Sequence, residues 1–339
     1  MPRRSVVFTA PYQVAVLEEP EPEPLPNQLM VQTLFSGISS GTECMIYRGQ
    51  FPDDMPIDVN ISALQGSFSY PLRYGYATVG RVVDTGLDVD HHWLGQLVFG
   101  FQPHTSLYCA DPDKLIPIPT GVTPQQAVFL PNMETAVNLV MDGRPMIGEH
   151  VLVFGQGIVG LLTTALLSQH PLGALVTLDK FSVRREFSLK IGAQLSLDPG
   201  FTDVKATIKN LMPAGADLAY ELSGLPQILN DVIALTGFDG RVIIGSWYGQ
   251  KHAELDLGGR FHRSRIRLIS SQVSSIAPEF LGRWTKTRRF EVAWKMMQII
   301  QPENFITHRI PITEAPQAYR LLDQQTEDVL QIILTYPGQ

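Results

Sequence analysis

The chain has 339 residues, with 26 Lys and Arg against 33 Asp and Glu, which gives a formal net charge of −7 at pH 7. This length is typical of about two domains. The content of 44% hydrophobic and 17% charged residues supplies large cores and excludes wholesale disorder. The negative charge argues against broad binding to nucleic acid or to an anionic membrane, because neutralising phosphates takes an excess of Lys and Arg.

Cysteines and targeting signals are sparse. Cys44 and Cys109 are the two cysteines, too few for a disulfide framework or a four-cysteine zinc site. The apolar run near the N-terminus is too short for a secretory signal, and no apolar stretch reaches the roughly 18 residues needed to span a bilayer. These missing signals predict a soluble, cytoplasmic protein.

Short strand-like runs between turn signals dominate the first third of the chain. They are Ser5–Phe8, Gln28–Leu34, Ala77–Asp84 and Gln96–Phe99. The acidic, proline-rich stretch Glu18–Gln28 predicts an exposed connection between strands. The long irregular stretch Phe51–Tyr70 is interpreted as either a functional loop or a structural insertion.

From about residue 124 the pattern changes to strands alternating with helices. The predicted strands are Val151–Phe154, Leu175–Asp179, Asp217–Ser223 and Gly240–Ser246. The predicted helices are Pro124–Met141 with an interruption at Pro131, Ile158–Ser168, Ser182–Ile191, Leu225–Leu235 and Arg289–Ile300. This alternation predicts an α/β fold with a doubly wound parallel sheet. A final run, Val329–Tyr336, predicts a strand that returns to the first domain.

A glycine motif lies between a predicted strand and a predicted helix, the context that dinucleotide binding requires. Gly155 allows the tight turn, Gly157 lets a pyrophosphate approach the backbone, and Gly160 lets the helix pack against the strand. The N–H groups at the start of the helix, at Ile158 and Val159, would then face the phosphates. The alternative is a glycine-rich turn that binds no nucleotide.

An acidic residue ends the next strand. Asp179 lies 24 positions after Gly155, close to the spacing at which an acid binds the adenosine ribose. It would repel a 2′-phosphate and therefore favours NAD over NADP. Lys180, Arg184 and Arg185 follow closely and could hold a phosphate, so NADP remains an alternative.

Four further segments resemble the medium-chain dehydrogenase/reductase superfamily, the zinc-type alcohol dehydrogenase-like proteins. They are FSGISSGTECMIYRG (35–49), similar to the family's G-I-C-G-T-D segment, PLRYGYATVGRVVDTG (71–86), LGQLVFG (94–100) and DKLIPIPTGV (113–122). The resemblance implies a GroES-like β-rich catalytic domain (1–123 and 301–339), a Rossmann domain (124–300), and a homodimer or homotetramer. Within the superfamily, S-G-I-S-x-G-T-E resembles a metal-poor bacterial subgroup similar to hydroxyethyl bacteriochlorophyllide dehydrogenase.

The metal ligands of the zinc members are replaced in this sequence. Ser40 stands before Gly-Thr, where those members have a cysteine ligand, and Tyr76 stands where they have a histidine. Pro131 lies where a third ligand would be. A serine hydroxyl and a phenol bind zinc poorly at neutral pH, so we expect neither catalytic nor structural zinc. The alternative is a noncanonical site built from Glu43, Glu134 or His104.

Without a metal, hydroxyl groups are the first candidates for catalysis, because a developing alkoxide needs hydrogen-bond donors and an acid. Tyr76 is the first candidate for the proton donor, with aromatic packing as the alternative. Ser40 and Thr42 could polarise a carbonyl or relay a proton; otherwise they cap a turn.

Acids and a histidine complete the candidate site. Glu43 and Glu134 could act as a base or orient a relay, and a salt bridge is the alternative for Glu134. His104 could be the final proton exchanger, because a histidine side chain ordinarily changes charge near neutral pH; otherwise it is a plain surface histidine.

A basic run follows later in the chain. Alternation would place Arg263, Arg265 and Arg267 on one face of a strand, where they could recognise an anionic substrate or a cofactor phosphate. The alternative is a solvated strand edge.

We therefore predict an NAD(P)-dependent, zinc-independent oxidoreductase that interconverts a secondary alcohol and a carbonyl of a small-molecule substrate. Two alternatives are an NADPH-dependent enoyl or quinone reductase, and a nucleotide-binding protein without catalytic activity.

Overall fold

The computed structural model describes residues 2–51, 57, 61–64, 66–200, 203–324 and 327–337. Much of the irregular stretch expected at Phe51–Tyr70 therefore lies outside the described residues. The chain forms two compact units: unit 1 is Met1–Pro131 with Met297–Gln339, and unit 2 is Asn132–Met296. Within the ranges described, no helix combines the length and apolar character needed to cross a membrane.

Unit 1 is rich in β-structure. Its strands are β1 (Arg3–Ala10), β2 (Gln13–Glu19), β3 (Leu29–Gly37), β4 (Thr78–Thr85), β5 (Leu97–Gly100), β6 (Leu107–Ala110), β7 (Leu115–Pro117), β14 (Ile306–Pro311) and β15 (Gln331–Thr335). Its helices are α1 (Ser40–Arg48), α2 (Pro124–Ala127) and α9 (Ala315–Gln324). One sheet has the order β14-β15-β3-β4-β5-β7, with β6 also paired to β3, and β1 pairs with β2.

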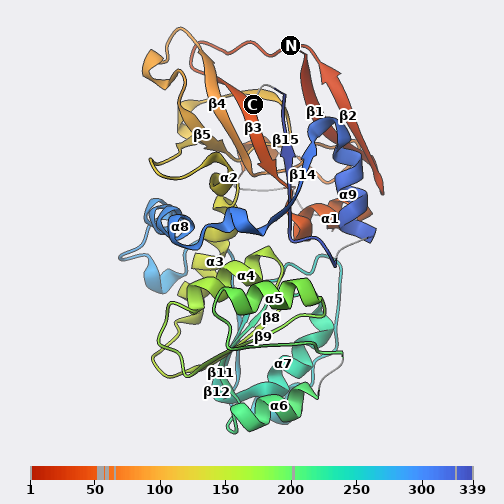
Figure 1. Ribbon diagram of the computed structural model, residues 1–339, viewed down its shortest axis with the longest axis vertical. Coiled ribbons are helices and arrows are strands. Elements are labelled where there is room, and N and C mark those ends of the chain that lie inside the picture. The colour runs from red at the N-terminus through yellow and green to blue at the C-terminus, as the bar shows by residue number, and fades with distance from the viewer. Residues whose placement is uncertain are drawn as a thin grey trace. The chain divides into compact units, whose positions relative to one another are not determined.

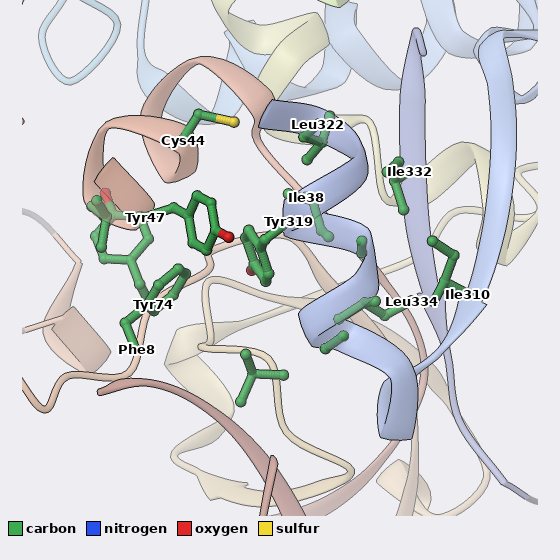
Figure 2. Close-up of a cluster of buried hydrophobic side chains, with 14 of the residues drawn as sticks. Phe8, Ile38, Cys44, Tyr47, Tyr74, Ile310, Tyr319, Leu322, Ile332 and Leu334 are labelled. Carbon is green, nitrogen blue, oxygen red and sulfur yellow. The ribbon is translucent and has the colours of Figure 1, made fainter. Parts of the chain in front are cut away.

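The C-terminal strand completes the sheet of unit 1. β15 pairs antiparallel with β3 and parallel with β14, and Figure 1 shows the blue C-terminal strands beside the red β3. The expectation that the tail returns to the first domain is therefore confirmed. Figure 2 shows the buried core that results, in which Phe8 and Ile38 from the N-terminal part of the chain share one cluster with Tyr319 and Leu334 from the C-terminal part.

Unit 2 is built on a parallel sheet. Its strands are β8 (His150–Phe154), β9 (Ala174–Leu178), β10 (Leu195–Leu197), β11 (Ala216–Glu221), β12 (Thr236–Ile244) and β13 (Arg267–Ser270). Its helices are α4 (Ile158–Leu167), α5 (Ser182–Lys190), α6 (Val204–Leu211) and α7 (Leu229–Leu235), with α3 (Leu130–Gly143) and α8 (Lys286–Ile300) crossing the unit boundaries. The order β10-β9-β8-β11-β12-β13 is the 3-2-1-4-5-6 order of a dinucleotide-binding Rossmann sheet.

Both faces of this sheet are covered, as its apolar strands predict. Successive residues of β8 alternate between two buried clusters: Leu152 lies with Ile208 of α6, whereas Val153 lies with Leu139 of α3. The predicted α/β fold with a β-rich second part is confirmed.

One predicted strand was wrong in extent. Only Arg267 of the basic run lies in a strand, β13, and Arg265 has a left-handed φ of 54°. A left-handed residue breaks the alternation of a strand. Arg263, Arg265 and Arg267 therefore do not form a face of one strand.

Candidate functional site

The glycine motif of unit 2 forms the turn between β8 and α4. Gly155 has φ 91°, and a Cβ there would lie 2.6 Å from the backbone of Leu222. A Cβ on Gly160 would lie 2.0 Å from the carbonyl oxygen of Gly155. Gly157 is the N-cap of α4 and has no neighbouring heavy atom within 4 Å of its Cβ position. Two glycines are thus required by packing, and the third opens space beside the helix terminus.

The residues at this turn fit a dinucleotide. The first N–H groups of a helix, here those of Ile158 and Val159, have no partner within the helix. They carry the partial positive charge that favours phosphate, and the open space beside Gly157 lets a pyrophosphate approach. No side chain of the turn adds a negative charge.

Asp179 ties the end of β9 to this turn. Its Oδ2 accepts a hydrogen bond of 2.8 Å from the Gln156 N–H, and its Oδ1 accepts one of 2.9 Å from the Phe181 N–H. The Arg184 guanidinium lies 3.7 Å from Oδ2, and burial lowers the pKa of Arg184, an effect that Asp179 partly offsets. Lys180 is exposed and lies 4.5 Å from the centroid of the Phe181 ring. An acid and two cations therefore stand together where the adenosine ribose is expected.

Arg185 has a different role. Its Nη1 donates to Asp198 Oδ2 at 3.0 Å and to the carbonyl oxygen of Asp179 at 2.9 Å. It binds neighbouring strands together, which leaves Lys180 and Arg184 as the candidates for contact with a cofactor phosphate.

In unit 1, the hydroxyl groups of Tyr76 and Ser39 meet. The Tyr76 hydroxyl donates a hydrogen bond of 2.5 Å to Ser39 Oγ. Ser39 is the N-cap residue of α1, and Ser40 is the first residue of the helix. Sequence reasoning named Ser40 and missed Ser39. The signal was present, because the chain has one residue more between Ile38 and Gly41 than G-I-C-G-T-D has, so either serine can stand at the cysteine position.

A buried carboxylate, that of Glu43, contacts the backbone of Ser39. Glu43 Oε1 accepts a hydrogen bond of 2.7 Å from the Ser39 N–H, and Oε2 accepts one of 2.6 Å from the Tyr319 hydroxyl. His104 Nε2 lies 2.9 Å from the same Oε2. Both Glu43 and His104 have no exposed surface.

The other side of the His104 ring is also occupied. Nδ1 lies 2.7 Å from Ser36 Oγ, which lies 2.7 Å from the Tyr336 hydroxyl. Burial raises the pKa of Tyr336, and burial followed by the charge of Glu43 raises the pKa of Tyr319 far above its ordinary value. Both phenols therefore remain protonated donors at neutral pH.

Thr42 and Glu134 are the remaining candidates. Thr42 is half-buried in the first turn of α1. Glu134, on α3 in unit 2, accepts hydrogen bonds from Nε and Nη2 of Arg289 at 3.1 and 2.7 Å. Burial raises the pKa of Glu134, and the Arg289 guanidinium offsets part of the rise. The structure thus brings Tyr76 and His104 into one network and places Glu134 in a buried ion pair.

The side chains at the hydroxyl pair do not fit a zinc ion. Ser39 and Tyr76 offer oxygen atoms that bind zinc poorly when protonated, and Glu43 already accepts from surrounding donors. In the part of the chain that the structure describes, no three or more His, Cys, Asp or Glu residues are placed to hold a metal.

Comparisons with known proteins find dehydrogenases of the same fold. A family model described as zinc-binding dehydrogenase matches residues 159–287. D-guloside 3-dehydrogenase of Escherichia coli (strain K12) is 24% identical, and the match covers 98% of this chain and 100% of the relative. The crystal structure of 2R,3R-butanediol dehydrogenase from Bacillus subtilis has a TM-score of 0.81 at 18% identity, covering 99% and 100% of the two chains. The alcohol dehydrogenase RspB from E. coli CFT073, complexed with NADH, has a TM-score of 0.79 at 19% identity, covering 98% and 99%.

Proposed function

We propose that this chain is a member of the medium-chain dehydrogenase/reductase superfamily, which its similarity to zinc-binding dehydrogenases and to D-guloside 3-dehydrogenase supports. We further propose that it is an NAD(P)-dependent oxidoreductase that interconverts a secondary alcohol and a carbonyl without zinc. The substrate is a small molecule. The full-length relative named D-guloside 3-dehydrogenase supports a hydroxyl group on a sugar-like ring as the reacting group. The GroES-like and Rossmann boundaries implied by the sequence, 1–123 with 301–339 and 124–300, remain part of this proposal.

The observation that carries the proposal is the hydrogen bond between Tyr76 and Ser39. By the family resemblance, Tyr76 stands where the zinc members have a histidine ligand, and Ser39 is one of the two serines that can stand at the position of their cysteine ligand. A hydroxyl can both donate to a substrate oxygen and hand over a proton. The hydrogens of both groups rotate, so Ser39 can donate to Tyr76 when Tyr76 turns its own hydrogen to substrate.

The bound cofactor supplies the hydride chemistry, accepting or delivering a hydride at the nicotinamide. In carbonyl reduction, Tyr76 gives its phenolic proton to the oxygen on which negative charge develops. The Ser39 hydroxyl then donates to the phenolate, and water restores the proton, since Tyr76 is only half-buried. In alcohol oxidation the same proton travels in the opposite direction. Thr42 and Ser40, at the start of α1, are proposed to line the place of the substrate oxygen.

The cofactor is proposed to be NAD, because Asp179 would repel a 2′-phosphate, with NADP as the alternative that Lys180 and Arg184 would permit. The N–H groups of Ile158 and Val159 would hold the pyrophosphate. Arg184 and Lys180 lie beside the ribose acid.

Tyr76→Phe tests this assignment, with Tyr12→Phe as the matched control because the Tyr12 ring is 56% exposed. The assay follows NADH formation on a panel of secondary alcohols and glycosides, using protein dialysed against a chelator, and includes enones with NADPH. We expect Tyr76→Phe to lower kcat by about 10²–10⁴-fold and the control to stay within about twofold. Stoichiometric zinc retained through dialysis, or turnover confined to enones, would contradict the proposal.

A further inference from the structure

We propose that Glu43 and His104 are positioning residues for the Tyr76–Ser39 hydroxyl pair, and that they act through the backbone that carries the two side chains. The inference rests on the proposed function, because the proposed function assigns the proton chemistry to that pair. The inference also claims that Glu43 and His104 determine the surroundings of Tyr76, and this claim can be tested without turnover.

Glu43 holds Ser39 through the backbone. It lies in the first turn of α1 and reaches back to accept from the Ser39 N–H at 2.7 Å, in the manner of a capping residue. The contact sets the position of Ser39 directly, since Ser39 makes no side-chain cap of its own. A buried carboxylate needs donors on its other oxygen. Tyr319, on α9, supplies one of them, and Figure 2 shows Tyr319 extending from α9 toward Tyr47 of α1.

His104 holds the backbone that carries Tyr76. Gly75, the residue before Tyr76, has φ 120°, and a Cβ there would lie 2.8 Å from Cδ2 and Nε2 of the His104 ring. The ring therefore lies directly against the chain at that glycine. Because His104 also contacts Glu43 at 2.9 Å, one buried pair touches the supports of both hydroxyl groups.

The orientation of the His104 ring is fixed on both sides. Tyr336 can donate to Ser36, Ser36 can donate to Nδ1, and Nε2–H can then donate to Glu43, which gives a consistent direction along the chain of hydrogen bonds. In this arrangement Glu43 accepts three hydrogen bonds, from the Ser39 N–H, the Tyr319 hydroxyl and His104 Nε2–H. The complete burial of His104 leaves it no direct contact with water, so we assign it a positioning role in place of final proton exchange.

A double-mutant cycle measures whether Glu43 acts through the pair. Glu43→Gln keeps the shape of the side chain but places an amide N–H₂ beside donors. We expect it to lower kcat by about 10–100-fold, with the KM for the cofactor unchanged, because misplacing a reacting group slows chemistry more than binding. In the Tyr76→Phe background the same change is expected to cost less than about threefold. Independent, multiplicative losses would overturn the proposal.

A spectroscopic readout does not depend on turnover. 3-Fluorotyrosine is incorporated at position 76, and its ¹⁹F resonance and phenol titration are recorded in the parent chain, in Glu43→Gln and in His104→Gln. We expect both variants to shift the resonance and the titration midpoint. The matched control is Glu149→Gln, which removes a buried carboxylate in unit 2 that pairs with Arg241 at 2.6 Å, and it is expected to leave the resonance unchanged.

Tyr319→Phe is the mild variant for the case that Glu43→Gln does not fold, since it removes one donor to Glu43 and keeps the ring. It is expected to shift the ¹⁹F resonance in the same direction by a smaller amount. A shifted resonance without turnover of any alcohol leaves the positioning role standing and rejects the proposed function. An unshifted resonance in every folded variant rejects the positioning role.

Discussion

We expect substitution of the buried Arg289 to lower the folding stability of unit 2 more than substitution of most other buried residues. Its side chain has no exposed surface. Nε and Nη2 donate to Glu134, and Nη1 donates to Asn138 Oδ1 at 2.5 Å and to the Ser275 carbonyl at 3.0 Å. Nη2 also donates to the carbonyl of Val273. Arg289→Met fills much of the volume but removes every donor.

The magnitude follows from the carboxylate left behind. Glu134 has a side chain only 4% exposed, and removing one partner of a buried ion pair costs about 3–5 kcal/mol of unfolding free energy. Burial already raises the pKa of Glu134, and loss of Arg289 removes the charge that offsets this. The pKa of Glu134 is higher in the folded than in the unfolded state. At a pH below the unfolded pKa the side chain is protonated in both states, and its ionisation then costs no stability. The penalty therefore grows as the pH rises through the unfolded and then the folded pKa, so Arg289→Met is expected to cost more at pH 8 than at pH 5.

Urea unfolding followed by tryptophan fluorescence measures the loss, since Trp247, Trp284 and Trp294 all lie in unit 2. The control is Arg288→Met, an exposed neighbour on α8 that should cost less than about 1 kcal/mol. Replacing Glu134 by Met together with Arg289 should restore most of the stability, because no lone charge remains. An Arg289→Met variant no less stable than the Arg288→Met control would refute the reasoning.

Two further predictions concern the cofactor and the thiols. Asp179→Ser should lower the ratio of kcat/KM with NADH to that with NADPH by about 10–100-fold, because the charge facing a 2′-phosphate is lost; an unchanged ratio in steady-state assays would contradict the assignment. Burial raises the pKa of Cys44 to about 12, so its thiolate fraction at pH 8 is on the order of 10⁻⁴. Iodoacetamide at pH 8, followed by mass spectrometry, should leave Cys44 unmodified until the chain unfolds. Because the unfolded thiol ionises near pH 8.5, this group's contribution to stability is complete below that pH and declines as the pH rises toward 12.

The turn proposed to bind the dinucleotide was predictable because its signals are local. β8, the glycine turn and α4 are consecutive in the chain, and the strand is apolar because both of its faces are buried. Asp179, the proposed ribose acid, directly follows the next strand, β9. The structure of the basic run was harder to predict. The alternating pattern of residue types does not reveal that Arg265 has a left-handed backbone conformation, and Arg residues occur both in exposed turns and at strand edges.

The support of the hydroxyl pair was beyond sequence reasoning for a different reason. Glu43 and Tyr319 are 276 positions apart, and Ser36 and Tyr336 are 300 apart. No periodicity within one element reports a contact that depends on β15 returning to β3. The sequence suggested that Glu43 orients a relay and that His104 is chemically active, but burial, which decides between exchange and positioning, appears only when both chain ends are folded together.

The two proposals are connected by a physical requirement. A metal ion fixes the geometry of its own ligands through several strong bonds, whereas one hydrogen bond between hydroxyl groups contributes only about 0.5–1.5 kcal/mol net and leaves both groups free to rotate. A hydroxyl pair that stands in place of metal ligands, as we propose for Tyr76 and Ser39, must therefore take its precision from the surrounding fold. Glu43 and His104 supply this on our account, and they depend on Tyr319 and Tyr336 from the C-terminal segment. The accuracy of a site in the N-terminal half of the chain is thereby tied to the docking of α9 and β15.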